Sequence, residues 1–309
     1  MNLMTGESKY FDVLERSLYN GALAGLSLSG DKFFYGNPLS SEGGYSRSEW
    51  FGCACCPSNI ARLVASIGNY IYATSPDAIY VNLFISSNTL ITAGKNKIAL
   101  SQKGNYPWDG NTIINISPDQ KIKRKLVVRI PGWAVNQPVP GDAYSFLQPE
   151  KPILSIKLNN QEVNYTMDKG YAVIEREWKK GDEIAISLPM NIERVIANDN
   201  IQDDNGLTAL QRGPLVYCLE HADNNGKTMN IILPDRAELS ASFKPALLGG
   251  IMIINSKVPV VNVSPDGESI TNSTKEITAI PYYAWANRGQ GEMQIWIPRK
   301  IKDLRLLSK

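Results

Sequence analysis

Three of the four cysteines in this chain of 309 residues lie within four positions, at Cys53, Cys55 and Cys56. Pro57 follows them directly, and proline suits the first turn of a helix because its missing N–H would be unpaired there anyway. A helix N-terminus carries unpaired N–H groups and about half a positive charge. A thiol at such a place has a lowered pKa, and the thiolate is both a nucleophile and a metal ligand. The cluster therefore predicts nucleophilic or metal-binding cysteines.

The residues alone leave other interpretations of this cluster open. A structural zinc site takes four ligands, often from two separated pairs, and the chain has one cluster. Cys218 stands in the apolar run GPLVYCLE, where a buried thiol is expected, and His221, the only histidine, is expected at the surface. Cys53 and Cys56 have the C-x-x-C spacing of a redox pair, but the thioredoxin-like motif belongs to a βαβ context. Three small buried residues at a tight turn remain the purely structural alternative.

Two amphipathic helices are expected beside the cluster. The first covers residues 9–26, where apolar side chains recur with helical spacing: Phe11, Leu14, Leu18, Ala22 and Leu26. The second begins at Pro57 and has one apolar face: Ile60, Leu63, Val64, Ile67 and Ile71. Between them lies FFYGNPLSSEGGYSRSEW, a long segment rich in glycine, serine and aromatic residues. Long ordered loops in compact domains are often functional, so this segment is expected to contribute to a site.

The pattern changes to strands after about residue 78. Apolar and β-branched runs alternate with turn residues, as in a protein built from antiparallel strands; the runs are 78–85, 111–116, 125–130, 171–178 and 182–188. We expect a mainly β fold with N-terminal helices, in which residues 1–75 precede two β-sandwich domains. The first sandwich is expected from residues 76–195 with a returning segment, 278–300, and the second from residues 196–277. The segment 197–206 is the expected crossing between them.

Composition excludes several classes of function. The net charge of +2 gives no reason to expect nucleic-acid binding or attraction to an anionic membrane. We find no run of about 18 apolar residues that could span a membrane, and the first residues lack the basic start and apolar core of a signal peptide. The compartment stays open between cytoplasm and periplasm. Four cysteines, three of them adjacent, are not a disulfide framework.

The cysteine motif, WFGCACCPSNIAR, resembles the signature of the β-L-arabinofuranosidases of glycoside hydrolase families 127 and 146. The stretches YFDVLERSLYNGALAGLSLSGDKFFYGNPL and IPYYAWANRGQGEMQIWIP resemble the same family, so the likeness runs from about residue 3 to 298. It implies an (α/α)6 barrel followed by β-sandwich domains, and residues 1–75 would be the last helices of that barrel. It also implies a retaining hydrolase with a cysteine nucleophile and a bound zinc ion.

Three residues carry the implied chemistry. By the resemblance Cys55 is the nucleophile and a zinc ligand, Cys56 is a second zinc ligand, and Tyr35 is an active-site tyrosine that contacts the substrate. The implied partners are plant glycans or glycopeptides that contain L-arabinofuranose. The family's Glu-x-Cys zinc ligands have no counterpart here, since the sequence contains no Glu-x-Cys. We therefore expect this chain to be the C-terminal part of such an enzyme, incomplete and inactive alone. The apolar faces of its helices would lack their cover from the rest of the barrel, so association into a homo-oligomer stays open.

Two other functions stay open at this stage. One is a non-catalytic β-sandwich module that binds carbohydrate or supports another domain. Its sugar-stacking faces could come from six aromatic residues, each of which is more often a core residue: Trp108, Trp133, Trp178, Tyr282, Tyr283 and Trp285. The other is the C-x-x-C redox protein. Tight zinc binding favours the hydrolase, no metal favours the module, and a reversible disulfide favours the redox protein.

Overall fold

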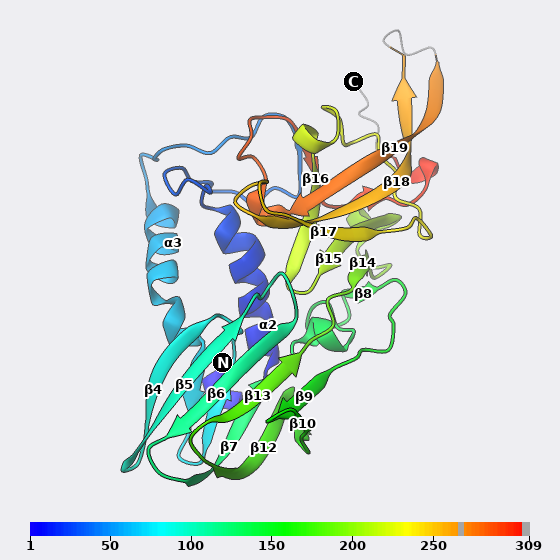
Figure 1. Ribbon diagram of the computed structural model, residues 1–309. Helices are drawn as coiled ribbons and strands as arrows, with labels where there is room; N and C mark the ends of the chain where they lie inside the picture. Colours follow the sequence, from blue (N-terminus) through cyan, green and yellow to red (C-terminus); the bar gives the residue numbers. More distant parts are fainter. Residues whose placement is uncertain (265–268, 305–309) are drawn as a thin grey trace. The chain divides into compact units, whose positions relative to one another are not determined.

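The computed structural model describes residues 1–264 and 269–304. The chain divides into two compact units, which are described separately. The first unit consists of Met1–Glu15, Arg62–Pro140 and Glu150–Met190, and the second consists of Arg16–Ala61, Gly141–Pro149 and Asn191–Lys309. The fold is mainly β with two N-terminal helices, as the sequence predicts (Figure 1).

The two expected helices form, with different ends. The N-terminal segment contains α1 (Asn2–Thr5) and α2 (Lys9–Arg16), and α2 continues into a π-helical segment, η1 (Ser17–Ala22). The second helix, α3, spans Cys55–Ser66 and is followed by a 3-10 turn, η2 (Ile67–Tyr70). Ile71 lies beyond the helix and packs with Phe11 and Leu83 of the first unit. Ile71 therefore belongs to this small apolar cluster and not to the face of α3.

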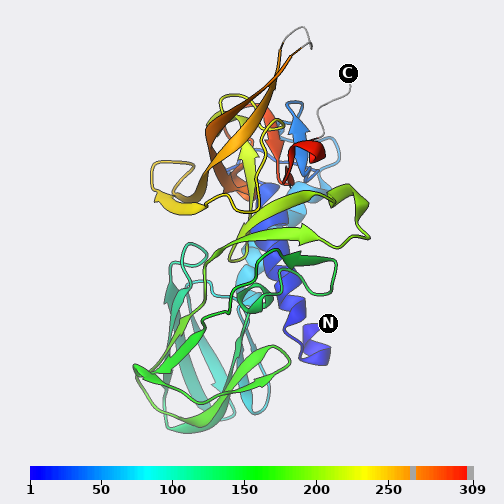
Figure 2. The same ribbon diagram turned by 90° about the vertical axis from the view of Figure 1, so that its right-hand side faces the viewer.

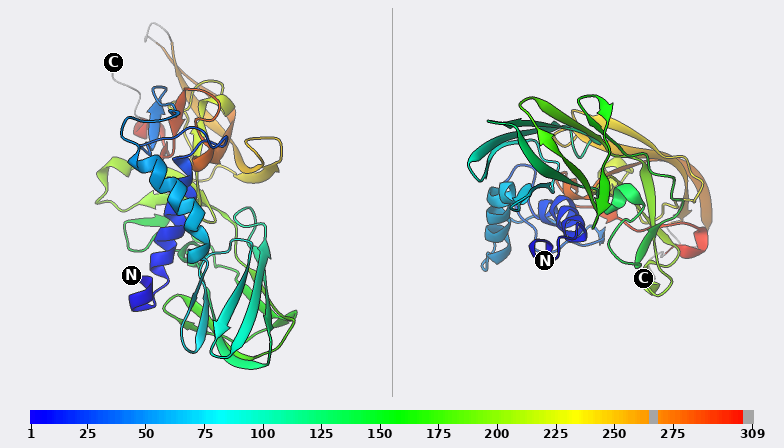
Figure 3. Two further views of the ribbon diagram at one scale, coloured as in Figure 1. Left: turned by 90° about the vertical axis from the view of Figure 1, so that its left-hand side faces the viewer. Right: turned by 90° about the horizontal axis from the view of Figure 1, so that it is seen from below.

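The first unit is a β-sandwich. One sheet has the strand order β10-β9-β13-β6-β5-β4, and the other has the order β11-β12-β7-β3-β2. Figure 3 shows β4, β5 and β6 side by side. The bounds are β2 (Tyr72–Thr74), β3 (Ala78–Val81), β4 (Ser87–Ala93), β5 (Asn96–Gly104), β6 (Asn111–Pro118), β7 (Ile122–Arg129), β9 (Ser155–Leu158), β10 (Gln161–Glu162), β11 (Thr166–Asp168), β12 (Tyr171–Trp178) and β13 (Asp182–Ser187).

The core of this sandwich comes from both sheets. Ile114 and Ile184 of the six-stranded sheet share one apolar cluster with Val128 and Ile174 of the five-stranded sheet. In β13 the buried residues alternate with less buried ones, which is the period-two pattern expected of a strand with one covered face. A 3-10 turn, η3 (Gly132–Val135), follows β7. The alternation read from the sequence therefore located these strands correctly.

The second unit is built on one ten-stranded sheet. Its main order is β17-β18-β19-β16-β15-β14-β8, with β1 paired to β20, β20 to β16 and β21 to β15. β18 and β19 form a long antiparallel hairpin (Figure 2). The bounds are β1 (Ser40–Glu42), β8 (Tyr144–Phe146), β14 (Ile192–Ala197), β15 (Leu207–Arg212), β16 (Leu215–Glu220), β17 (Ser240–Lys244), β18 (Ile251–Val263), β19 (Ile270–Pro281), β20 (Glu292–Gln294) and β21 (Ile297–Pro298). The remaining 3-10 turns are η4 (Gln202–Asp204), η5 (His221–Asp223), η6 (Tyr282–Ala284) and η7 (Ile301–Asp303).

Two details of the expected organisation differ from this arrangement. Residues 278–300 do not return to the first sandwich, since β19, β20 and β21 all pair with strands of the second unit. The segment 197–206 connects β14 to β15, which pair antiparallel, so it is a connection within one sheet. Alternation along a strand shows that one face is covered, but it carries no information about which sheet the strand joins.

The expected exposure of the helices is wrong for the first helix. Phe11 is 8% exposed and Leu18 is 7% exposed, so both are buried within the chain. On α3, by contrast, only Pro57 is buried, and Val64 is 43% exposed. Self-association remains a prediction, and α3 is one helix that exposes apolar side chains for it; Val13 of α2, 52% exposed, is another source. Among the described helices, none combines the length and the apolar character that a membrane span requires.

Candidate active site

The cysteine cluster lies at the beginning of α3. Cys55 is the first residue of the helix and Cys56 is the second. The helix therefore begins two positions before the expected start at Pro57. Side chains of the first turn bond back to the carbonyl groups there. Ser58 Oγ donates to the carbonyl oxygens of Ala54 (2.9 Å) and Cys55 (3.0 Å), and Asn59 Nδ2 donates to that of Cys55 (2.8 Å). These bonds fix the turn that presents both thiols.

The end of the preceding helical segment packs directly on this helix. A Cβ atom built on Gly25 would lie 2.4 Å from Ile60 Cδ1, so no larger residue fits there without displacing the isoleucine. In the structure the glycine allows close approach of α3, which sets the position of the cysteine turn.

The two adjacent thiols face one another without forming a disulfide. Cys55 Sγ and Cys56 Sγ are 3.8 Å apart and both cysteines are free, as is Cys53. A disulfide would require about 2.05 Å between the sulfurs. Cys55 and Cys56 are therefore neighbouring free thiols at the N-terminus of α3. Their roles in chemistry remain predictions.

Tyr35 lies in the loop between the two helices, and its hydroxyl group lies near the Cys55 sulfur. Its Oη lies 3.9 Å from Cys55 Sγ, at the long end for a hydrogen bond to sulfur, a weak acceptor. The tyrosine ring packs edge-on against Phe51, with 4.3 Å between centroids. The backbone beside it is anchored because Phe33 and Ser48 exchange hydrogen bonds of 2.8 and 3.0 Å. The structure thus brings Tyr35 together with Cys55, as the sequence comparison of motifs implied.

The contacts within the site shift the pKa values of Cys55, Cys56 and Tyr35 in different directions. Hydrogen bonding from Tyr35, followed by that from Cys56 and Cys53, lowers the pKa of the Cys55 thiol. Partial burial and the neighbouring Cys55 raise the pKa values of Cys56 and Tyr35. Cys55 is therefore the first of the three to lose its proton. An exposed thiolate at a helix N-terminus, with a hydroxyl directed at it, is suited to nucleophilic attack.

We expect Tyr35→Phe to raise the pKa of Cys55. The phenol hydrogen bond stabilises the charged thiolate, so its removal shifts the thiol–thiolate equilibrium toward the neutral form. The pH at which iodoacetamide alkylates Cys55 at half its maximal rate should then move upward. Peptide-resolved mass spectrometry in the presence of a chelator measures this midpoint. Tyr45→Phe, at an exposed tyrosine of the same loop, is the control, and an equal shift in both variants would contradict the prediction.

The residues present can supply part of a zinc site. With Zn–S bonds of about 2.3 Å, two ligands of a tetrahedral zinc ion lie about 3.8 Å apart, which matches the distance between Cys55 Sγ and Cys56 Sγ. Within the described part of the chain, however, no three His, Cys, Asp or Glu side chains are grouped to hold a metal. The pair therefore fits two of the four ligands of a zinc ion and leaves the others unassigned.

The remaining sulfur and imidazole groups lie outside this site. Cys218 is buried in β16, as predicted, and burial raises the pKa of its thiol. His221 is half-buried and not at the surface, and a Cβ atom on Gly291 would lie 2.1 Å from its ring. Neither residue is a candidate for chemistry with the cluster.

The aromatic residues considered for sugar stacking are mostly core residues. Trp178, Tyr282 and Trp285 are at most 3% exposed, and Trp108, Trp133 and Tyr283 are half-buried. This set of residues therefore gives no exposed stacking platform in either unit.

Sequence reasoning missed Arg47, which is buried in the loop that carries Tyr35. Its guanidinium donates to the carbonyl oxygens of Trp285 (2.7 Å) and Ala24 (3.0 Å) and lies 4.4 Å from the centre of the Phe34 ring. The only signal in the sequence is a single arginine in an aromatic-rich segment. Its partners are far away along the chain, so no local pattern could have identified them.

Comparison with known families finds domains of one glycoside hydrolase family in succession along the chain. Residues 1–69 match the beta-L-arabinofuranosidase GH127 catalytic domain, residues 78–190 the GH127 middle domain, and residues 192–298 the glycoside hydrolase family 127 C-terminal domain. A curated relative is the non-reducing end beta-L-arabinofuranosidase of Bifidobacterium longum subsp. longum, which is 32% identical over 94% of this chain and 45% of its own length.

Solved structures give the same result. A GH127 beta-arabinofuranosidase superimposes with a TM-score of 0.94 at 42% identity, over 98% of this chain and 48% of that protein. A GH127 beta-L-arabinofuranosidase from Geobacillus stearothermophilus T6 superimposes with a TM-score of 0.87 at 38% identity, over 97% and 48%. The chain thus spans about half the length of these relatives. With three consecutive domain matches and this structural agreement, the chain belongs to glycoside hydrolase family 127.

Proposed function

We propose that this chain supplies the nucleophile-bearing part of a retaining β-L-arabinofuranosidase, with Cys55 as the nucleophile. The observation that carries the proposal is the placement of Cys55 at the first position of α3, with Tyr35 Oη directed at its sulfur. Family membership and the activities for which the relatives are named support the reaction class. The substrate class proposed is plant glycans or glycopeptides that carry L-arabinofuranose.

The proposed reaction has two steps at the anomeric carbon. The Cys55 thiolate attacks that carbon while a carboxylic acid protonates the departing oxygen, and water then hydrolyses the glycosyl-cysteine with the same carboxyl group as base. Tyr35 stabilises the thiolate before attack. Zinc, if bound by Cys55 and Cys56, would favour the deprotonated thiols.

We further propose that these 309 residues hydrolyse arabinofuranosides slowly by themselves. Among the described residues, the side chains that hydrogen-bond to the Cys55 thiol are those of Tyr35, Cys56 and Cys53, and none of them is a carboxylic acid. A general acid typically contributes about 10²–10⁴ to the rate. With two of four zinc ligands identified, the metal would also be held weakly.

The test is an assay of the purified chain with a chromogenic β-L-arabinofuranoside and added zinc. Zinc binding is measured separately by titration calorimetry. Cys55→Ser removes the proposed nucleophile, and Cys218→Ser is a matched control at a buried cysteine. We expect turnover close to the Cys55→Ser background. Fast turnover that Cys55→Ser abolishes would contradict the incomplete site but support the nucleophile, and fast turnover that survives Cys55→Ser would contradict the nucleophile itself.

A further inference from the structure

The loop that carries Tyr35 is fastened to a turn of the C-terminal domain, residues 282–291. Strand β1 within this loop pairs with β20, which follows the turn. Tyr282 Oη donates to the carbonyl oxygen of Pro38 (2.9 Å), and the backbone N–H of Leu28 donates to Asn287 Oδ1 (3.0 Å). All of these residues belong to the second unit. The loop therefore takes its shape from a segment about 250 positions later in the chain.

Arg47 contacts both Trp285, in the turn of residues 282–291, and Phe34, the residue directly before Tyr35. Its two terminal nitrogens donate to backbone carbonyl groups of Trp285 and Ala24, and its guanidinium covers the Phe34 ring. The Phe34 ring also stacks on Trp285, with 5.3 Å between centroids. Phe34 is 6% exposed, so the residue directly before Tyr35 is held between packed groups. Loss of the Arg47 guanidinium would remove one of the two groups that pack on the Phe34 ring.

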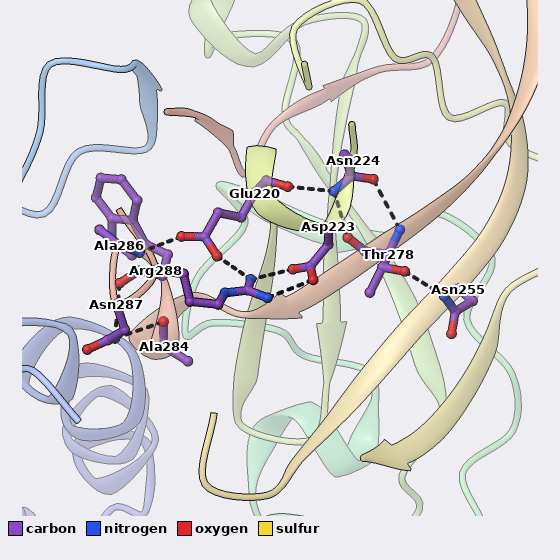
Figure 4. Close-up of polar contacts among 10 residues, drawn as sticks. Glu220, Asp223, Asn224, Asn255, Thr278, Ala284, Ala286, Asn287 and Arg288 are labelled. Carbon is purple, nitrogen blue, oxygen red and sulfur yellow. Dashed lines mark hydrogen bonds and ion pairs between the residues drawn. The ribbon is translucent and has the colours of Figure 1, made fainter. Parts of the chain in front are cut away.

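The turn that receives Arg47 is itself stabilised by buried charge. Ala286 has a φ of +54°, a left-handed conformation that alanine adopts uncommonly. Its N–H donates to Glu220 Oε1 at 2.7 Å, and Glu220 also pairs with Arg288, which contacts both carboxylate oxygens of Asp223 (Figure 4). Glu220 is 1% exposed. The ion-pair cluster thus maintains the conformation in which the Trp285 carbonyl group meets Arg47.

The contacts of Arg47 hold neighbouring segments of the chain together. Burial lowers its pKa to about 10, although the Glu220 carboxylate acts in the opposite direction. In the described part of the chain its guanidinium has no ion-pair partner within 4.0 Å, and its bonds go to backbone carbonyl groups and an aromatic ring. A planar guanidinium can make all three contacts at once, whereas a lysine ammonium cannot.

We infer that Arg47 is a positioning residue for Tyr35, and that through Phe34 and Trp285 it makes the C-terminal domain part of the active-site framework. The contacts of Arg47 are with Ala24, Phe34 and Trp285, and Cys55 is not among them. Its effect is to keep the Tyr35 hydroxyl within reach of the Cys55 sulfur. The inference rests on the site proposed above, but it is tested by thiol reactivity and not by turnover, so a chain that fails to hydrolyse arabinofuranosides leaves it intact.

The experiment measures the iodoacetamide alkylation rate of each cysteine in the 309-residue chain at one pH, with a chelator present. We expect Arg47→Met to slow Cys55 by the same factor as Tyr35→Phe, and the double variant to slow it no further. Such non-additivity is the signature of two residues that act through one contact. Arg47→Lys should give an intermediate rate, because lysine keeps the charge but loses the bridging geometry.

Cys218 reports whether a variant has simply unfolded. It is buried in the same unit, so it should stay unreactive if Arg47 acts only on Tyr35. Arg194→Met is the matched control, because Arg194 is a partly buried arginine of that unit that donates to the Ala237 carbonyl group. It should leave the Cys55 rate unchanged. An unchanged Cys55 rate in a folded Arg47→Met or Arg47→Lys variant, or additive losses in the double variant, would overturn the inference. Reaction of Cys218 in both Arg47 variants would also overturn it, since Arg47 would then hold the fold and not Tyr35.

Discussion

Replacing Arg129 with alanine lowers the free energy of unfolding of the first unit by about 3–5 kcal/mol, the cost of breaking a buried ion pair from one side. Arg129 is fully buried at the end of β7. Its Nη1 bonds to Asp12 Oδ1 at 2.7 Å, its Nη2 to Glu15 Oε1 at 2.5 Å, and its Nε to the carbonyl oxygen of Asn82 at 2.6 Å. Removal of the guanidinium leaves two carboxylates without their cation.

The loss is large because both carboxylates are mostly withdrawn from water, and the Asp12 side chain is 13% exposed. Glu15 is 1% exposed, and its oxygens also accept hydrogen bonds from Tyr106 Oη (2.6 Å) and Trp133 Nε1 (3.1 Å). Burial raises the pKa of Asp12 even though Arg129 opposes this. Burial alone would lower the pKa of Arg129, but Glu15 and Asp12 outweigh it and raise it. The charged forms of Arg129 and of the two carboxylates therefore stabilise one another.

Urea unfolding followed by tryptophan fluorescence measures the effect. Lys123→Ala is the matched control on the same strand, because its pair with Glu175 is exposed and 3.6 Å long, and exposed pairs contribute about 0–1 kcal/mol. The combined variant Arg129→Met, Asp12→Leu and Glu15→Met should recover part of the loss, since no buried charge stays unpaired. A loss below about 1 kcal/mol for Arg129→Ala would refute the buried-network argument.

The second large effect is expected at Cys55 in a complete enzyme. We expect Cys55→Ser to lower kcat by about 10³-fold or more in a chimera in which the N-terminal half of the Geobacillus stearothermophilus relative precedes this chain. The serine hydroxyl stays protonated at neutral pH, so the proposed nucleophile is lost while the shape of the site is kept. On the proposed mechanism the chimera should be active before mutation, because we expect the other half to supply the acid and the zinc ligands that the contacts of Cys55 lack.

The chimera is assayed with a chromogenic β-L-arabinofuranoside at saturating substrate. Cys53→Ser is the adjacent control, and it should reduce kcat far less, since Cys53 is not the first residue of α3. Equal losses from Cys53→Ser and Cys55→Ser would point to a shared structural effect and would contradict the nucleophile assignment.

Much of the fold followed from local patterns. Strand positions such as β12 and β13 could be predicted because alternation of apolar and polar residues depends only on having one covered face. The start of α3 could be placed to within two residues because Pro57 is compatible only with the first turn of a helix. The chemical character of the cluster followed from the same position.

The partners of residues far apart in the chain could not be predicted in this way. Residues 278–300 have strand patterns that would suit either β unit, and pairing with β16 and β18 decided the outcome. Arg129 and Arg47 look like ordinary charged residues in the sequence. Only the tertiary structure buries each of them among the groups that satisfy its hydrogen bonds.

The sequence by itself determined the elements and the thiol cluster, because helical and strand periodicity and the helix N-terminus are local properties of the chain. The tertiary structure decided that Tyr35, twenty residues before Cys55, lies with its hydroxyl 3.9 Å from the sulfur. That contact depends on a loop shaped by Trp285 and Asn287. A hydrogen bond between side chains is set by the packing of the segments that carry them, and packing joins residues that no local pattern connects.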